Sequence, residues 1–364
     1  MTQHLCQVFI PKRAPQYFIL YLARTKNCEP KMITIPMLHK FNCWACVTLG
    51  LCLNALLIYL VLRRSAKEMK VYSRILFQTC FIDLYMITVI ALVQPIYVVY
   101  NGFNTMIADG PSKDFPHPYN FFFMMAWFWG LFFSILSNCV PFVYRYFLLC
   151  ELKQMSLKLY AFLLFLLAFL VLIFVAGFTW AAFPGEAEMG VMREAHESYA
   201  KYMNIDPGSD EFSIILIMRT DSIRWLLSCA YILTVQTVCY TIIIYCGFKI
   251  KEFVKRSTES CGRQNAANDV NRQLSFILML QTSLPVAEAT FVLVCMITSM
   301  LPNKYVYFIG FGTMPMHWIP ALNPLITIVV VKPYRHFCTP WIKRKVDAKT
   351  DQTPNGTPLT HMMS

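Results

Sequence analysis

The chain has 364 residues, of which 57% are apolar and only 14% are charged, and its formal net charge is +12. Soluble domains carry about 25% charged residues, so the composition excludes an ordinary water-soluble protein and predicts an all-α, polytopic membrane protein. The excess of cations is expected in loops on the cytoplasmic side of the membrane, and we expect no nucleic-acid partner.

Seven apolar runs are each long enough to cross a lipid bilayer as a helix. About 20 residues span roughly 30 Å of hydrocarbon, because a helix rises 1.5 Å per residue. The runs cover residues 41–62, 72–100, 119–149, 159–183, 222–248, 273–300 and 305–331. We therefore predict a seven-transmembrane bundle over 41–331. An N-terminal tail at 1–40 precedes it, and a cytoplasmic tail at 332–364 with a short interfacial segment follows it.

The distribution of cations predicts the orientation of this bundle. With the N-terminus outside, the predicted cytoplasmic segments hold 20 Lys and Arg residues and the predicted outer segments hold 12. Cytoplasmic loops are enriched in cations, so this count favours an extracellular N-terminus and a cytoplasmic C-terminus. The glycosylation sequon Asn355-Gly356-Thr357 would then remain unmodified, whereas a glycan there would indicate the inverted topology.

Polar side chains in four of the predicted helices lie at a common depth. They are Asn54, Asp83, Ser134, Asn138 and Asn323. Counted from the cytoplasmic end of each run, they lie roughly 11–17 Å deep at 1.5 Å per residue. Lipid offers no hydrogen-bond partner, so we expect them to face inward and bond one another. This layer is either a static network that holds helices together or a switch that rearranges, and Pro285 and Pro324 are expected to kink the helices beside it.

The predicted cytoplasmic edge combines arginine with tyrosine. The third run ends in Tyr144-Arg145-Tyr146, and the seventh is followed by Lys332-Pro333-Tyr334-Arg335. An arginine at a helix end can simply extend to lipid phosphates, but Arg145 is enclosed by two tyrosines. The mixture of aromatic and cationic residues after 332 is typical of a short helix at the lipid headgroups.

Aromatic residues gather in the opposite half of the bundle. A cavity between helices that is lined by aromatic side chains and a few polar groups is where a small ligand is expected. The candidates are Trp127, Glu288, His317 and Trp318. Aromatic residues that only pack or face lipid would produce the same pattern. Glu288 and His317 lie near mid-depth, where a pair between them is one option.

The sequence carries no recognisable catalytic, cofactor or metal constellation. The seven histidines are scattered, and Cys43-Trp44-Ala45-Cys46 stands alone without a second cysteine pair. The phosphate-binding loop and the nucleophile-elbow motif are both absent. We therefore expect no enzyme, no cofactor and no metal site.

Together, these motifs resemble those of seven-helix G-protein-coupled receptors. The carriers of the resemblance are Asn54, Asp83, Tyr144-Arg145-Tyr146, Pro285 and Asn323-Pro324. The stretch Asn323–Ile328 with Pro333-Tyr334-Arg335, and the stretch Met69–Cys80, are most like the Srd branch of the nematode serpentine chemoreceptors, within the Str superfamily. The resemblance spans about 41–340. It departs at Tyr144, where such receptors usually have an acid, and in the segments 101–125 and 184–221, which lack a cysteine for the usual disulfide.

The resemblance implies a chemoreceptor for olfaction in the plasma membrane of sensory neuron cilia. Such a receptor would bind a small chemical ligand in the outer half of the bundle and activate a heterotrimeric G protein. Tyr144, Arg145, Tyr146 and Arg335 would then form the G-protein coupling site. The alternative is a ligand-gated channel or a small transporter of seven helices, which would need a continuous polar pore. The ligand, the G-protein subtype and the expressing cell are not readable from the sequence.

Overall fold

The computed structural model describes residues 35–64, 73–100, 103–183, 185–203, 213–219, 221–261 and 314–338, together with positions 280, 283, 286 and 290. Most of the predicted run 273–300, including Pro285 and Glu288, therefore lies outside the described residues. The same holds for the greater part of the predicted tails at 1–40 and 332–364.

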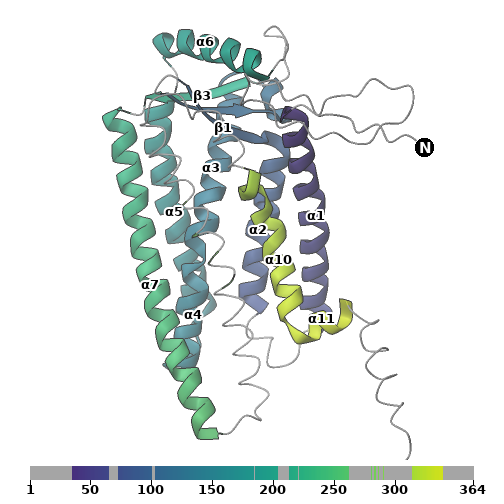
Figure 1. Ribbon diagram of the computed structural model, residues 1–364. Helices are drawn as coiled ribbons and strands as arrows, with labels where there is room; N and C mark the ends of the chain where they lie inside the picture. Colours follow the sequence, from purple (N-terminus) through teal and green to yellow (C-terminus); the bar gives the residue numbers. More distant parts are fainter. Residues whose placement is uncertain are drawn as a thin grey trace, which may run out of the picture.

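The described chain forms a bundle of long helices (Figure 1). Its members are α1 (Ile35–Arg64), α2 (Ser73–Val93), α3 (Tyr119–Ser137), α4 (Cys139–Leu149), α5 (Leu157–Ala182), α7 (Ile223–Cys261) and α10 (Ile319–Val330). The short helix η4 (Met314–Trp318) precedes α10, and α11 (Lys332–Cys338) follows it and turns across one end of the bundle. Within the described residues, 5 segments are long and apolar enough to cross a membrane. They are Met37–Arg63, Ser73–Val93, Tyr119–Leu149, Leu157–Ala182 and Ile223–Phe253.

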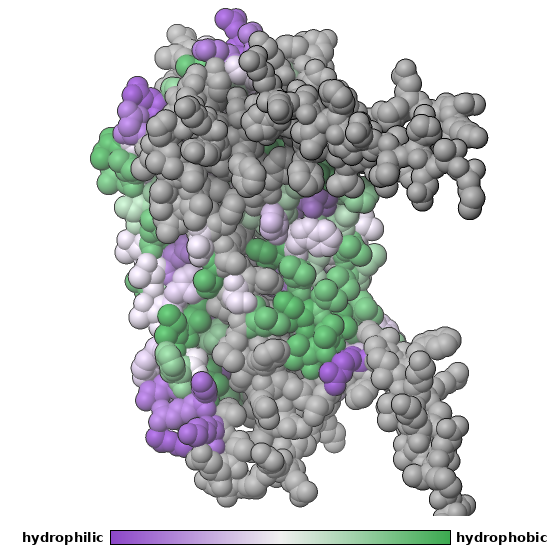
Figure 2. All heavy atoms as spheres, in the orientation of Figure 1, coloured by the Kyte–Doolittle hydropathy of each residue, from purple (hydrophilic) through white to green (hydrophobic). Residues whose placement is uncertain are grey.

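The surface of this bundle suits contact with lipid. On α5, Phe162, Phe165, Phe169 and Leu172 are all exposed, and their spacing of three to four residues places them in one stripe along the helix. Figure 2 shows hydrophobic side chains gathered at mid-height on the visible face and hydrophilic side chains at the C-terminal end of α7. An exposed apolar stripe of this kind is unfavourable in water and favourable in contact with the hydrocarbon of a membrane.

A three-stranded antiparallel sheet covers one end of the bundle, which sequence reasoning did not anticipate. Its strands are β1 (Pro95–Tyr100), β2 (Phe103–Ala108) and β3 (Ser213–Arg219), in the order β1-β2-β3. We call this the sheet end and the opposite one the α11 end. Helix α6 (Glu186–Met203) lies over the sheet on the side away from the bundle (Figure 1). The predicted loop 184–221 thus contains a helix and a strand.

Both faces of the sheet are buried, which explains the composition of β3. One face packs against α6 through residues such as Ile107 and Tyr199, and the other joins the core of the bundle through Met106 and Leu216. A strand covered on both faces is apolar throughout and does not alternate. The run Ser213–Arg219 therefore lacks the alternating signature of a strand.

Helix α2 ends at Val93, so the prediction of a helix over 72–100 is wrong beyond that residue. Pro95 has no N–H for a helical hydrogen bond, and a residue that precedes proline is disfavoured in the helical region. Gln94 turns the chain with a φ of 45°, and Pro95 begins β1. The chain returns at Gly110, where a Cβ would lie 2.5 Å from the Leu92 carbonyl oxygen. That contact requires glycine and holds Asp109 close to the end of α2.

Candidate functional site

Three buried polar side chains join α1, α2 and α10 in the middle of the bundle. Asn323 Nδ2 donates a hydrogen bond to Asp83 Oδ1 at 2.9 Å, which links α10 to α2. Asn54 Nδ2 donates to the Pro320 carbonyl at 3.0 Å and to the Gly50 carbonyl at 2.9 Å, which links α1 to α10. All three side chains are buried. We call Asn54, Asp83 and Asn323 the polar layer.

Two atoms of the polar layer retain unused bonding capacity. Asn54 Oδ1 and Asp83 Oδ2 are buried and have no hydrogen-bond partner among the described residues. A buried oxygen without a partner costs free energy comparable to a lost hydrogen bond. Each can therefore accept a water or a new donor, and the layer can gain a partner without first breaking its two interhelical bonds.

Prolines in two helices explain why amide side chains occupy these positions. Pro324 cannot donate to the carbonyl four residues earlier, which is that of Pro320, and Asn54 supplies the missing donor. Pro141 likewise leaves the Ser137 carbonyl free, and Gln78 Nε2 of α2 donates to it at 3.3 Å. A neighbouring helix thus satisfies each freed carbonyl.

The third predicted helix is divided at the place where Pro141 acts. Helix α3 ends at Ser137, and α4 begins at Cys139. Asn138 lies at the junction and donates to the Ser134 carbonyl of its own helix at 2.9 Å. The amide nitrogen of Asn138 thus bonds within its own helix and not to the other helices as predicted, whereas the predicted role of the Ser134 hydroxyl stays a prediction. Gln78, which sequence reasoning missed, makes one link between α2 and α3, and the Tyr85 hydroxyl makes another by donating to the Ala126 carbonyl at 2.9 Å.

Gln78 also connects this junction to α5. Its Oε1 accepts a short hydrogen bond from the Tyr160 hydroxyl. The Tyr160 ring in turn packs edge-on against the Tyr144 ring, with the two ring centroids 5.6 Å apart. The sequence did contain a signal for Gln78, because a glutamine inside an apolar run needs a hydrogen-bond partner as much as an asparagine does.

We expect leucine at Gln78 to lower the free energy of unfolding by about 1–3 kcal/mol, because it removes two interhelical bonds and each is worth about 0.6–1.7 kcal/mol in a membrane bundle. Unfolding of the purified protein in detergent measures the change. The matched control is Thr88→Val on the same helix, because Thr88 is exposed and bonds only to the Leu84 carbonyl of its own helix. Equal stability of the two variants would contradict the bridging role of Gln78.

Arg145 is the largest fully buried side chain among the residues that the structure describes, with 1% of its surface exposed. Tyr144 beside it is also buried, whereas Tyr146 is half-buried and donates to Glu151 at 3.1 Å. Arg335 is exposed on α11, and its neighbour Tyr334 is fully buried. The predicted coupling residues thus lie toward the α11 end, but Arg145 is enclosed in this arrangement and not presented at the surface.

The three predicted pocket residues that the structure describes lie toward the sheet end. Trp127 is buried against Phe128, and its Nε1 has no partner among the described residues. Trp318 Nε1 donates to Asn42 Oδ1 at 2.9 Å, which joins η4 to α1. His317 is buried beside His39 and Cys43 of α1, a contact that sequence reasoning missed. The proposed partner of His317, Glu288, lies outside the described residues.

Comparison with known proteins adds a family and a fold. The family model described as serpentine type 7TM GPCR chemoreceptor Srd matches residues 40–340. A crystal structure of squid rhodopsin matches with a TM-score of 0.58 and 15% sequence identity, over 89% of this chain and 93% of that chain. A search of curated proteins returned no match. The two matches confirm the predicted seven-helix membrane fold class and leave its orientation as a prediction.

Proposed function

The chain belongs to the serpentine type 7TM GPCR chemoreceptor family Srd, and from this premise we propose that it detects a small chemical ligand and activates a heterotrimeric G protein. The observation that carries the proposal is the family match over residues 40–340, which includes every predicted helix of the bundle. We propose no enzymatic activity.

The proposed ligand site lies in the half of the bundle next to the sheet. Trp127 and Trp318 provide aromatic surface there, and the unbonded indole N–H of Trp127 is a polar group that a ligand can engage. In the proposed orientation the sheet end is extracellular. By resemblance, the receptor belongs in the plasma membrane of sensory neuron cilia and serves olfaction. Glu288 stays a candidate for this site.

The proposed coupling site lies at the α11 end, around Tyr144, Arg145, Tyr146 and Arg335. A ligand shifts a receptor toward a second arrangement only to the extent that it binds that arrangement more tightly. The polar layer lies between the two sites. Asn54 and Asp83 each have an oxygen without a partner, and Pro324 removes one backbone hydrogen bond from α10. These features support a layer that changes partners and thereby releases Arg145. Pro285 remains a candidate for a second kink.

The competing function is a ligand-gated channel or small transporter of seven helices. A pore would need polar residues along its whole length, whereas the polar layer is flanked by apolar core residues such as Leu57 and Ile90. Within the described residues this favours a receptor.

The test is heterologous expression with a panel of volatile and water-soluble compounds, while G-protein activation and membrane current are recorded in parallel. We expect at least one compound to activate the G protein in cells that express the receptor. When the G protein is omitted, we expect that compound to evoke no membrane current. A ligand-evoked current that persists without any G protein would overturn the proposal in favour of the channel.

A further inference from the structure

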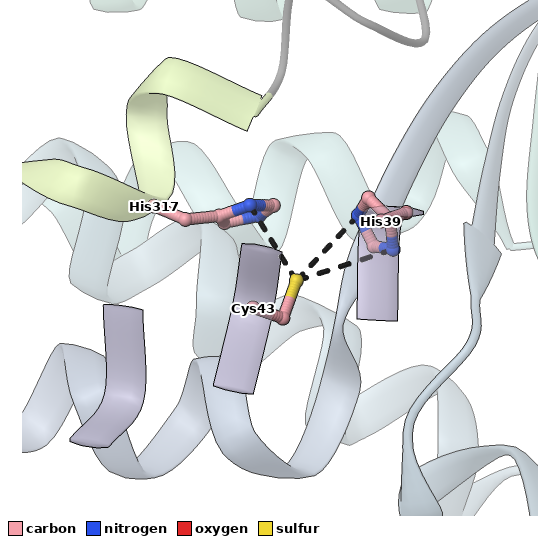
Figure 3. Close-up of side chains that lie close together, drawn as sticks. All are labelled: His39, Cys43 and His317. Carbon is pink, nitrogen blue, oxygen red and sulfur yellow. Dashed lines mark hydrogen bonds between the residues drawn. The ribbon is translucent and has the colours of Figure 1, made fainter. Parts of the chain in front are cut away.

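Three potential metal ligands from distant parts of the chain meet at the sheet end of the bundle. They are His39 and Cys43 of α1 and His317 of η4 (Figure 3). Cys43 Sγ lies 3.6 Å from His39 Nε2 and 3.6 Å from His317 Nδ1. The candidate ligand atoms of all three residues lie within 4.8 Å of one another, and all three side chains are buried. No other such cluster occurs in the part of the chain that the structure describes.

Helix geometry and the η4 turn bring the three side chains together. His39 and Cys43 are four residues apart, so they lie on one face of α1. His317 is 274 residues from Cys43 and is placed by η4, which is tied to α1 by the bond from Trp318 to Asn42. Figure 3 shows the sulfur between the two imidazole rings. The neighbouring Cys46 belongs to the same sequence motif but not to this cluster.

Hydrogen bonding alone satisfies this group poorly. A thiol has a single proton to donate and is a weak donor. Cys43 has an imidazole nitrogen at 3.6 Å on each of two sides, and His317 Nε2 is buried without a partner among the described residues. Unpaired buried polar groups are costly. A cation bound to the sulfur and to one nitrogen of each imidazole would replace these weak contacts with coordinate bonds.

The two sulfur–nitrogen distances match those of a tetrahedral zinc site. With Zn–S of about 2.3 Å and Zn–N of about 2.0–2.1 Å, a tetrahedral angle sets the sulfur and nitrogen ligands about 3.6 Å apart. The two measured distances from Cys43 Sγ are both 3.6 Å. The three ligands therefore need little movement to receive the ion.

Asp109 is placed to support His39, as a carboxylate often does behind a metal-bound histidine. Its Oδ2 is buried without a hydrogen-bond partner among the described residues and lies 3.6 Å from His39 Nδ1, which is itself 4.0 Å from Cys43 Sγ. Its Oδ1 pairs with Lys40 at 3.1 Å. A carboxylate behind a ligating histidine fixes the ring and raises its basicity. Backbone hydrogen bonds from Asp109 to the Gln94 carbonyl at 3.3 Å and from Gly110 to the Val93 carbonyl at 3.1 Å hold Asp109 in this place.

We propose that His39, Cys43 and His317 bind one Zn²⁺ ion, with Asp109 orienting His39. Binding forms a zinc–sulfur bond and releases the thiol proton of Cys43 to solvent, so affinity falls as the pH falls. Three protein ligands leave a fourth position for water or an added small ligand. The ion would fasten η4, and with it the start of α10, to α1 in the half of the bundle next to the sheet.

Metal binding by the purified full-length protein in detergent tests this. We expect equilibrium dialysis to find one tightly bound Zn²⁺ per chain, and Co²⁺ in its place to give the absorption band of a cobalt–thiolate bond. Cys43→Ser should lose both signals, whereas Cys46→Ser, a buried cysteine on the same helix, should keep both. Asp109→Asn should bind Zn²⁺ about 10–100-fold more weakly, as other losses of a supporting carboxylate do.

Two results would overturn the site. One is tight Zn²⁺ binding that is equal in the Cys43→Ser and Cys46→Ser proteins. The other is the absence of a cobalt–thiolate band in the unmodified protein, which stands even if Cys43→Ser fails to fold. Added Zn²⁺ should also raise the unfolding temperature of the unmodified protein and of Cys46→Ser, because a ligand that binds only the folded state stabilises it.

Discussion

A receptor with alanine in place of Asp83 is expected to be less stable and to respond to ligand with lower potency. Asn323 would lose the acceptor at 2.9 Å that joins α10 to α2. We expect a loss of about 0.6–1.7 kcal/mol in the free energy of unfolding. If the layer couples the two ends of the bundle, potency should fall by about 5- to 150-fold, the usual size of a coupling free energy.

The control for Asp83 is an exchange of the two partners. In the double variant Asp83→Asn with Asn323→Asp, an amide at 83 can donate to a carboxylate at 323, so the interhelical bond is retained with its direction reversed. We expect stability to recover in this variant. Signalling that recovers in step with stability would identify a static network, whereas signalling that stays impaired at normal stability would identify a switch. A single Asp83→Ala variant with full stability and full potency would contradict both roles.

Sequence reasoning located the polar layer because depth in a membrane can be counted. Helical rise converts position in a run into distance from the surface, and lipid forces polar groups inward. Asp83 and Asn323, which are 240 residues apart, thereby fall at one depth, and the structure joins them. Asn138 falls at the same depth but bonds within its own helix, because the break near Pro141 exposes local carbonyls that depth alone does not reveal.

The sheet end was much harder to predict. Apolar runs were interpreted as helix throughout, but Pro95 ends α2 and begins a strand, and the buried strand Ser213–Arg219 has no alternation to separate it from a loop or a helix segment. The cluster of His39, Cys43 and His317 was missed for a different reason. His39 and Cys43 share a helix face and were detectable, but only the packing of η4 against α1 brings His317 to them.

Replacing Arg145 by alanine is expected to abolish ligand-evoked G-protein activation while the receptor still reaches the cell surface. Only 1% of the Arg145 side chain is exposed, and it interacts with neighbouring groups. Burying a guanidinium is costly, so a receptor that needed it only for contact with lipid would leave it at the surface. We infer that the enclosed side chain marks the resting arrangement and that activation exposes it to the G protein. Surface labelling and a G-protein assay in the same cells measure the two quantities.

The matched control is Arg63→Ala, since Arg63 is exposed in the last turn of α1, and α1 ends near α11 (Figure 1). That substitution removes an equal charge and should leave signalling intact. Arg145→Lys should give a partial response, because lysine retains the charge but not the planar set of donors. Full ligand-evoked signalling by a normally trafficked Arg145→Ala receptor would remove Arg145 from the coupling site. Constitutive activity in that variant would instead assign Arg145 to the contacts that hold the resting arrangement.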